Sequence, residues 1–237
     1  MKEKIIVALD VETPAEAREI FAELREEVGA FKIGLQLFTS GGASFVKELV
    51  DDGAKIFLDV KFHDIPNTVA KASIEVARLG VWMFNVHAIG GGEMIRQNVE
   101  SVTEFCEREN LEKPKIIGVT VLTSSNKETL LETGIEKEIQ SQVLNLAQLS
   151  AKYGLDGVVA SPLETQMIRK ELGKDFLIVT PGIRPNLETK DDQKRVMTAN
   201  EAVANGADYL VIGRPILQAE NRSKAVKQIL ESFESEN

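Results

Sequence analysis

The sequence has a single cysteine, Cys106, and no long uninterrupted apolar segment. One cysteine excludes a disulfide within the chain and favours a reducing, cytoplasmic location. No stretch approaches the roughly 18 apolar residues that a membrane-spanning helix needs, and the first residues lack the pattern of a signal peptide. We therefore expect a soluble protein that neither enters nor crosses a membrane.

Positive charge is also scarce. The chain of 237 residues has 28 Lys and Arg against 37 Asp and Glu, which gives a formal net charge of -9 at pH 7. A surface of this sign repels polyanions, so nucleic acid is not an expected partner. Hydrophobic residues make up 43% and charged residues 27% of the sequence, which is typical of a chain that folds throughout.

Short apolar runs alternate with helical patterns along the whole chain, and eight such pairs can be recognised. The expected strands are IIVALD ending at Asp10, FKIGLQLF around Lys32, KIFLDVKF around Asp59, MFNVHAI around His87, KIIGVTVLT ending at Thr123, GVVAS ending at Ser161, FLIVTPGI ending at Ile183 and YLVIGR ending at Arg214. Apolar strands buried on both faces predict a closed, parallel α/β structure, a (β/α)8 TIM barrel, with residues 1–237 as a single domain. A doubly wound open sheet is the alternative fold.

Several expected helices carry start signals. Thr13-Pro14, Asn67-Thr68 and Ser161-Pro162 precede the first, third and sixth helices, where capping side chains and a first-turn proline are favoured. In a barrel of this kind, the loops after the strands converge at one end and hold the chemistry. The polar residues at the strand ends are therefore the candidates for a functional site.

The third expected strand contains both an acid and a lysine. Because side chains alternate between the faces of a strand, Asp59 and Lys61 point the same way, and Leu58, Val60 and Phe62 point the other way. Asp10 and Lys32 would add a second pair of opposite charges on neighbouring strands. One Asp/Lys pair is most simply a structural ion pair, but several on adjacent strand ends favour a functional site, since an apolar interior would cost less.

The loops after the seventh and eighth strands have features of a phosphate site. One contains Gly182 and Arg184, and the other contains Gly213 and Arg214. Glycine lets backbone N–H groups approach an anion, and the arginine fork matches phosphate oxygens. In barrels of this type these two loops commonly bind phosphate.

The run Asp59-Val60-Lys61-Phe62-His63-Asp64-Ile65-Pro66-Asn67-Thr68 closely resembles the signature of the orotidine 5'-phosphate decarboxylase family, in its bacterial type. The similarity continues through most of the chain, in the segments Leu9-Asp10, Lys32-Ile33-Gly34, Val86-His87-Ala88, Val121-Leu122-Thr123, Thr180-Pro181-Gly182-Ile183-Arg184 and Ile212-Gly213-Arg214. The resemblance implies an enzyme that forms uridine 5'-monophosphate and CO2 in pyrimidine biosynthesis, without a cofactor or metal.

The resemblance also implies a role for each matching residue. Lys61 would donate the proton within a charged network that contains Lys32, Asp59 and Asp64, and Asp64 and Thr68 would reach the site of a second subunit in a homodimer. Substrate binding would involve Asp10 and Lys32 at the ribose, Thr123 at the pyrimidine, Gln193, Gly213 and Arg214 at the phosphate, and Arg184 in a loop that closes over it. Ile65 and Pro181 would form an apolar pocket around the departing CO2, although packing explains them equally well.

Two alternative functions remain at this stage, and the roles of the two histidines stay open. His63 and His87 lack companions at metal-ligand spacing, which favours structural roles for both. A metal-dependent sugar-phosphate decarboxylase or synthase of the same barrel type would share the D-x-K-x-x-D string but carry glutamate where this chain has Lys32. A non-catalytic sensor of a phosphorylated metabolite would need the pocket but not the pairing of Lys61 with Asp59.

Overall fold

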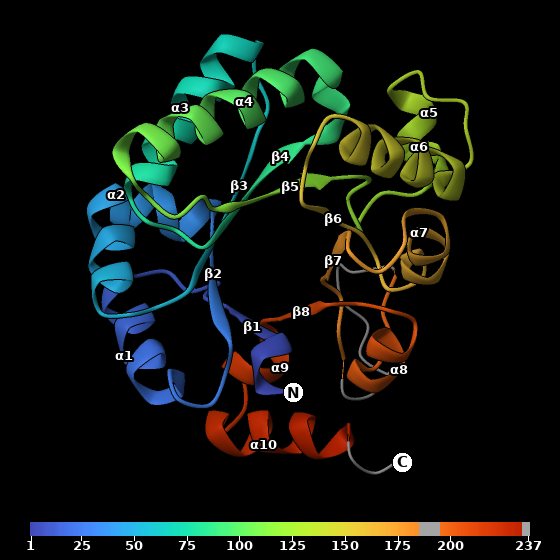
Figure 1. Ribbon diagram of the computed structural model, residues 1–237. Helices are drawn as coiled ribbons and strands as arrows, with labels where there is room; N and C mark the ends of the chain where they lie inside the picture. Colours follow the sequence, from blue (N-terminus) through green and yellow to red (C-terminus); the bar gives the residue numbers. More distant parts are fainter. Residues whose placement is uncertain (185–194, 234–237) are drawn as a thin grey trace.

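The computed structural model describes residues 1–184 and 195–233, and its strands form a closed parallel barrel in the order β1 to β8 (Figure 1). The strands are β1 (Ile5–Ala8), β2 (Ala30–Gly34), β3 (Ile56–Phe62), β4 (Met83–His87), β5 (Lys115–Val119), β6 (Gly157–Val159), β7 (Leu177–Thr180) and β8 (Tyr209–Ile212). Pairing of β1 with β8 closes the ring. The expected barrel is confirmed, and the open-sheet alternative is wrong.

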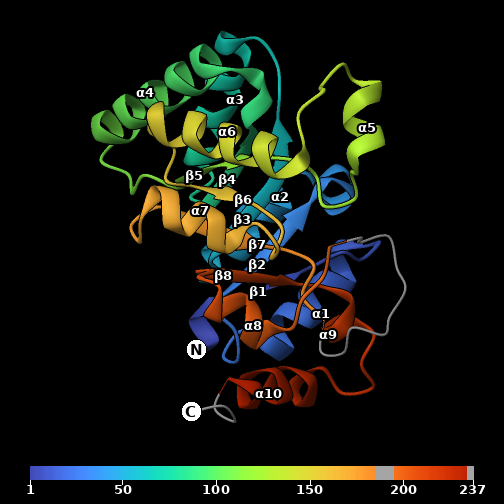
Figure 2. The same cartoon turned by 90° about the vertical axis from the view of Figure 1, so that its right-hand side faces the viewer.

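The helices lie outside the ring of strands (Figure 1, Figure 2). They are η1 (Lys2–Lys4), α1 (Pro14–Leu24), α2 (Leu35–Asp51), α3 (Pro66–Arg78), η2 (Ala88–Gly90), α4 (Gly92–Glu109), α5 (Lys127–Glu132), α6 (Ile139–Lys152), α7 (Thr165–Leu172), α8 (Ala199–Ala204), α9 (Arg214–Leu217) and α10 (Arg222–Ser232). Within the described residues, no helix combines the length and the apolar character needed to cross a membrane.

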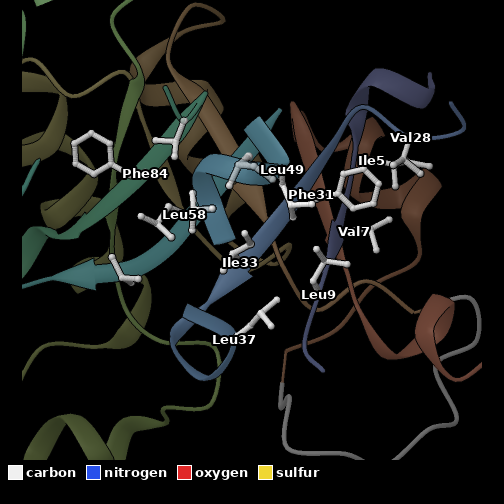
Figure 3. Close-up of a cluster of buried hydrophobic side chains, with 14 of the residues drawn as sticks. Ile5, Val7, Leu9, Val28, Phe31, Ile33, Leu37, Leu49, Leu58 and Phe84 are labelled. Carbon is white, nitrogen blue, oxygen red and sulfur yellow. The ribbon is translucent and has the colours of Figure 1, made fainter. Parts of the chain in front are cut away.

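Alternation along the strands divides the apolar core into an outer and an inner part. Outward-facing side chains such as Ile5, Val7 and Ile33 pack beneath the helices (Figure 3). The inward-facing set fills the barrel interior and consists of Ile6, Ala8, Ala30, Phe57, Met83, Ile117, Val179 and Val211. Full burial of one large apolar side chain stabilises the fold by about 1.5–3 kcal/mol. These inward-facing side chains fill the middle of the barrel.

The boundaries of several expected elements need correction. Five strands end two to four residues earlier than expected, at Ala8, Val119, Val159, Thr180 and Ile212. The second strand ends at Gly34, and the following apolar residues start α2, because a short apolar run does not distinguish a strand from a helical turn. The third helix begins at Pro66 rather than after Asn67-Thr68, since proline already has a helical φ and needs no N–H partner in the first turn. The Thr13 cap is confirmed, because its side chain accepts a hydrogen bond from the Glu16 N–H.

The start signal expected for the sixth helix, Ser161-Pro162, lies slightly before the observed start of that helix. The Ser161 hydroxyl accepts a hydrogen bond from the Leu163 N–H at 3.2 Å, so it stabilises the turn before the helix. Helix α7 itself begins at Thr165. Ser161 therefore lies one turn before the residue at which the helix begins.

Candidate active site

A pocket of about 270 Å³ opens at the carboxyl ends of the strands. Its walls bring together residues from β2, β3, the loops after β1, β5, β7 and β8, and the start of α9. They are Asp10, Lys32, Asp59, Lys61, Thr123, Pro181, Gly182, Arg184, Gly213 and Arg214. These positions lie far apart in the sequence. The structure therefore collects most of the predicted site residues in one cavity.

A chain of alternating charges crosses one side of this pocket. The Lys32 Nζ lies 3.0 Å from Asp10 Oδ1 and 3.4 Å from Asp59 Oδ2. On the other side of the same carboxylate, Lys61 Nζ donates a hydrogen bond to Asp59 Oδ1 at 2.7 Å. The side chains of Lys32, Asp59 and Lys61 are 10%, 14% and 28% exposed. Little water reaches these three side chains, so their charges interact strongly, whereas the Asp10 side chain is 58% exposed.

Electrostatics keep the buried pair Lys32 and Asp59 ionised. Burial opposes the charged form of Lys32, but the carboxylates of Asp59 and Asp10 outweigh it and raise the pKa of the Lys32 ammonium. Burial likewise opposes ionisation of Asp59, yet the charges of Lys32 and Lys61, with hydrogen bonds from Lys61 and Asn85, lower the pKa of the Asp59 carboxyl. Both groups therefore remain charged through the neutral pH range.

A bulge in β3 sets the direction of Lys61. Leu58 pairs with Phe84 of β4 and Phe62 pairs with Val86, so the three intervening β3 residues lie opposite Asn85 alone. Lys61 has a φ of 53°, which is unusual for a residue other than glycine. Such strained backbone is often found at functional sites, where the surrounding structure holds it in place.

The rest of the pocket wall is apolar. It is formed by inward-facing residues near the strand ends, namely Ala8, Phe57, Val119, Val121, Val159, Ala160 and Val211. Apolar walls exclude water and strengthen electrostatic interactions with anything that binds beside the charged network. The pocket thus combines a charged side with an apolar side, as a planar ligand that carries local charge would need.

The predicted phosphate residues Gly213, Arg214 and Arg184 line the same pocket, and Gly213 lies next to Asp10. Gly213 directly precedes α9, and a side chain built there would lie 3.4 Å from the Ala8 Cβ and 3.5 Å from Asp10 Oδ2. Arg214 is the first residue of α9, and Arg184 is buried with 6% of its surface exposed. Gln193 lies outside the described residues.

Three predicted site residues lie outside the pocket of their own chain. Asp64, Ile65 and Thr68 are all exposed, and 67% of the Ile65 surface is accessible. The Asp64 carboxylate accepts a hydrogen bond from the Ile65 N–H at 2.6 Å, which fixes the turn before α3. A contribution of these residues to catalysis would therefore require a second subunit.

Sequence reasoning missed Asn85 of β4. Asn85 is fully buried, donates a hydrogen bond from Nδ2 to Asp59 Oδ1 at 2.7 Å, and accepts one at Oδ1 from the Lys61 N–H at 2.8 Å. Its only sequence signal is a polar residue at an inward position of an apolar strand, two residues before His87.

A buried ion pair supports the loop that contains Thr123. Glu164 is 2% exposed and pairs with Arg195. Arg195 also donates to the Leu122 carbonyl at 2.8 Å, directly before Thr123. Burial raises the pKa of the Glu164 carboxyl, although Arg195 opposes the shift.

The two histidines lie side by side without forming a metal site. The ring centroids of His63 and His87 are 5.7 Å apart. Burial and the charges of His63 and Lys61 lower the pKa of the His87 imidazole, against the opposing effect of Asp59. Across the described part of the chain, no three His, Cys, Asp or Glu side chains come together in a way that could hold a metal ion.

Comparison with protein families gives one match that covers nearly the whole chain. The profile of the "Orotidine 5'-phosphate decarboxylase / HUMPS family" matches residues 3–229. A protein of Syntrophotalea carbinolica named orotidine 5'-phosphate decarboxylase is 51% identical, over 98% of this chain and 95% of its own length. One of Geobacter sulfurreducens with the same name is also 51% identical, over 98% of this chain and 96% of its own length.

Solved structures give the same result. The crystal structure of orotidine 5'-phosphate decarboxylase from Lactobacillus acidophilus superimposes with a TM-score of 0.85 at 36% sequence identity. The match covers 97% of this chain and 98% of the other. The similarity therefore extends over nearly the whole chain.

Proposed function

The chain belongs to the orotidine 5'-phosphate decarboxylase / HUMPS family, and we propose that Lys61 is the proton donor with which its pocket performs the decarboxylation. The protein converts orotidine 5'-monophosphate to uridine 5'-monophosphate and CO2. The observation that carries the residue assignment is the contact of Lys61 Nζ with the buried Asp59 carboxylate inside the pocket.

The chemistry explains the need for an ammonium group. Breaking the bond between C6 of the pyrimidine and its carboxylate leaves an electron pair in the ring plane, where the π system cannot delocalise it. A positive charge held beside C6 stabilises that pair as it develops. The pair then takes a proton from Lys61 Nζ, which gives uridine 5'-monophosphate and a neutral amine that solvent reprotonates.

The neighbouring charges prepare Lys61 for this step. Asp59 holds the ammonium group at 2.7 Å, and Lys32 holds the other oxygen of Asp59 at 3.4 Å. Because Asp59 is fixed from both sides, little rearrangement is needed as charge develops on the substrate. Asp59 also lies where it would crowd the substrate carboxylate, which adds a contribution from ground-state destabilisation.

Other pocket residues bind the parts of the substrate that do not react. Asp10 and Lys32 take the ribose hydroxyls, Thr123 takes the polar edge of the pyrimidine, and Gly213 and Arg214 take the phosphate together with Gln193. Arg184 closes over the phosphate, and Pro181 contributes to the apolar surface that meets the departing CO2. Support comes from their common location in the pocket, apart from Gln193, which lies outside the described residues.

A homodimer would complete the site. Asp64, Ile65 and Thr68 are exposed at the rim of their own barrel, where they contribute nothing to the pocket of the same chain. In a symmetric dimer each subunit would supply Asp64 and Thr68 to its partner. With its single, buried cysteine, the enzyme fits a cytoplasmic location.

Mixing two inactive variants tests the shared site. Lys61→Ala and Asp64→Ala are each expected to be inactive, but an equal mixture with exchanged subunits should recover about a quarter of the wild-type activity. Half of the dimers would be hybrids, each with one site that has both Lys61 and Asp64. Activity is measured after subunit exchange in mild denaturant and its removal. No recovery, with hybrids demonstrated by differential tagging, would contradict shared sites.

The pocket argues against the metal-dependent alternative. The Lys32 ammonium lies between Asp10 and Asp59, where a divalent cation would need a carboxylate ligand instead. We expect turnover of orotidine 5'-monophosphate to persist in excess EDTA, as followed by the change in ultraviolet absorbance.

Two other results would support a different function. Turnover of a sugar phosphate that EDTA abolishes would support the metal-dependent alternative. Binding of orotidine 5'-monophosphate without turnover would support a sensor of phosphorylated metabolites. The same preparation, assayed with both substrates and with or without EDTA, distinguishes these outcomes from the one proposed.

A further inference from the structure

Asn85 is the one buried amide in direct contact with the charged network, as far as the described residues show. Its neighbours on the inner face of the barrel include the apolar side chains of Met83 and Ile117. An amide buried among apolar groups destabilises the fold unless its hydrogen bonds are satisfied. Asn85 satisfies them only through two β3 residues, Asp59 and Lys61.

The chemistry of these two partners fixes the orientation of the amide. An ionised carboxylate can only accept hydrogen bonds, and a backbone N–H can only donate one. Asn85 Nδ2 must therefore face Asp59, at 2.7 Å, and Oδ1 must face the Lys61 N–H, at 2.8 Å. A leucine of similar size could make neither bond, and an aspartate could make only the second.

The bulge in β3 explains why an asparagine is needed. Asp59, Val60 and Lys61 lie opposite Asn85 alone, so the extra residues lose regular pairing with β4. The Asn85 side chain takes the place of that pairing for the Lys61 N–H. It thereby holds Lys61 in its left-handed conformation, with a φ of 53°.

The same side chain also determines where Asp59 lies. Asp59 Oδ1 accepts from both Asn85 Nδ2 and Lys61 Nζ, each at 2.7 Å. Asp59 Oδ2 faces Lys32. Asn85 is thus tied to both ends of the catalytic lysine, directly at its backbone and through Asp59 at its ammonium group.

We propose that Asn85 is a positioning residue that aims the Lys61 ammonium group at the reacting carbon by fixing both the Lys61 backbone and Asp59. This inference rests on the proposed role of Lys61. Asn85 does not line the pocket, so it acts on the reaction only through these two residues. Its loss should therefore change turnover far more than substrate binding.

The variant Asn85→Leu tests this role because it keeps the size of the side chain and removes both hydrogen bonds. We expect kcat to fall about 30-fold, the effect of losing a hydrogen bond to a charged group, and KM for orotidine 5'-monophosphate to stay within about threefold. Asn85→Asp keeps the acceptor for the Lys61 N–H but places a second carboxylate beside Asp59. It should lower kcat at least as much, because that carboxylate draws the Lys61 ammonium group away from its position.

Asn98 provides a matched control. It is also fully buried, in α4, and neither polar atom of its side chain has a hydrogen-bond partner among the described residues. Asn98→Leu should therefore leave both kcat and KM unchanged. Each variant is compared by kcat per folded active site, determined from binding of uridine 5'-monophosphate.

Two patterns would overturn the inference. A kcat of Asn85→Leu or Asn85→Asp within about twofold of wild type would show that Asn85 does not position Lys61. A rise in KM that accounts for the whole loss in kcat/KM would assign Asn85 to substrate binding instead. If Asn85→Leu does not fold, the Asn85→Asp variant decides between the same outcomes. Failure of the wild-type protein to decarboxylate the substrate would instead reject the proposed function itself.

Discussion

Replacing Lys61 with alanine is expected to lower kcat about 10⁵-fold. A positioned proton donor contributes about 10³-fold and a positioned charge about another 10²-fold, and Lys61 supplies both. The fold should survive, because Asp59 keeps its contacts with Lys32 at 3.4 Å and with Asn85 at 2.7 Å. The decarboxylation rate at saturating substrate measures the effect.

Lys61→Arg separates the two contributions of Lys61. Arginine keeps a positive charge near Asp59, but its guanidinium group does not release a proton near neutral pH. We expect the kcat of this variant to remain far below that of the wild-type enzyme. Uridine 5'-monophosphate binding checks that each variant retains a folded pocket. A Lys61→Ala enzyme within tenfold of wild-type kcat would contradict a role in proton transfer.

Arg214→Ala should also have a large effect, and only on a substrate that carries a phosphate. Two charge-assisted hydrogen bonds from one arginine fork are together worth about 4 kcal/mol, which corresponds to a loss of about 10³-fold in kcat/KM for orotidine 5'-monophosphate. For the nucleoside orotidine, which lacks the phosphate, the loss should stay within about threefold. Phosphate binding energy that is used in the transition state would appear partly in kcat.

A surface arginine serves as the control for Arg214. Arg18 of α1 has 45% of its side chain exposed and pairs with Glu48, and neither residue lines the pocket. Arg18→Ala should leave kcat/KM unchanged for both substrates. Equal losses with orotidine and its monophosphate in Arg214→Ala would contradict the assignment of the phosphate site.

The barrel and the pairing of Asp59 with Lys61 could be predicted from local patterns. Buried parallel strands give near-continuous apolar runs, and a strand period of two places both charged residues on one face. The structure bears this out, with Leu58 and Val60 in the outer core and Asp59 and Lys61 lining the pocket. Here the local pattern is sufficient because it depends only on neighbours in the sequence.

Asn85 and the support around Thr123 could not be predicted in this way. The role of Asn85 depends on the β3 bulge, which shifts the register with β4 and turns the Lys61 N–H toward it. Arg195 reaches Glu164 and the Leu122 carbonyl from a distant part of the chain. Such contacts are set by three-dimensional packing and leave no periodic signal in the sequence.

A crystal structure of the enzyme with bound uridine 5'-monophosphate would test the central claim most directly. The account predicts the Lys61 Nζ within about 3.5 Å of C6 of the pyrimidine, where it can deliver a proton. The Asp59 carboxylate should still hold it, and the phosphate should contact Arg214. A pyrimidine bound with C6 turned away from Lys61, or a Lys61 side chain directed to solvent, would contradict the mechanism.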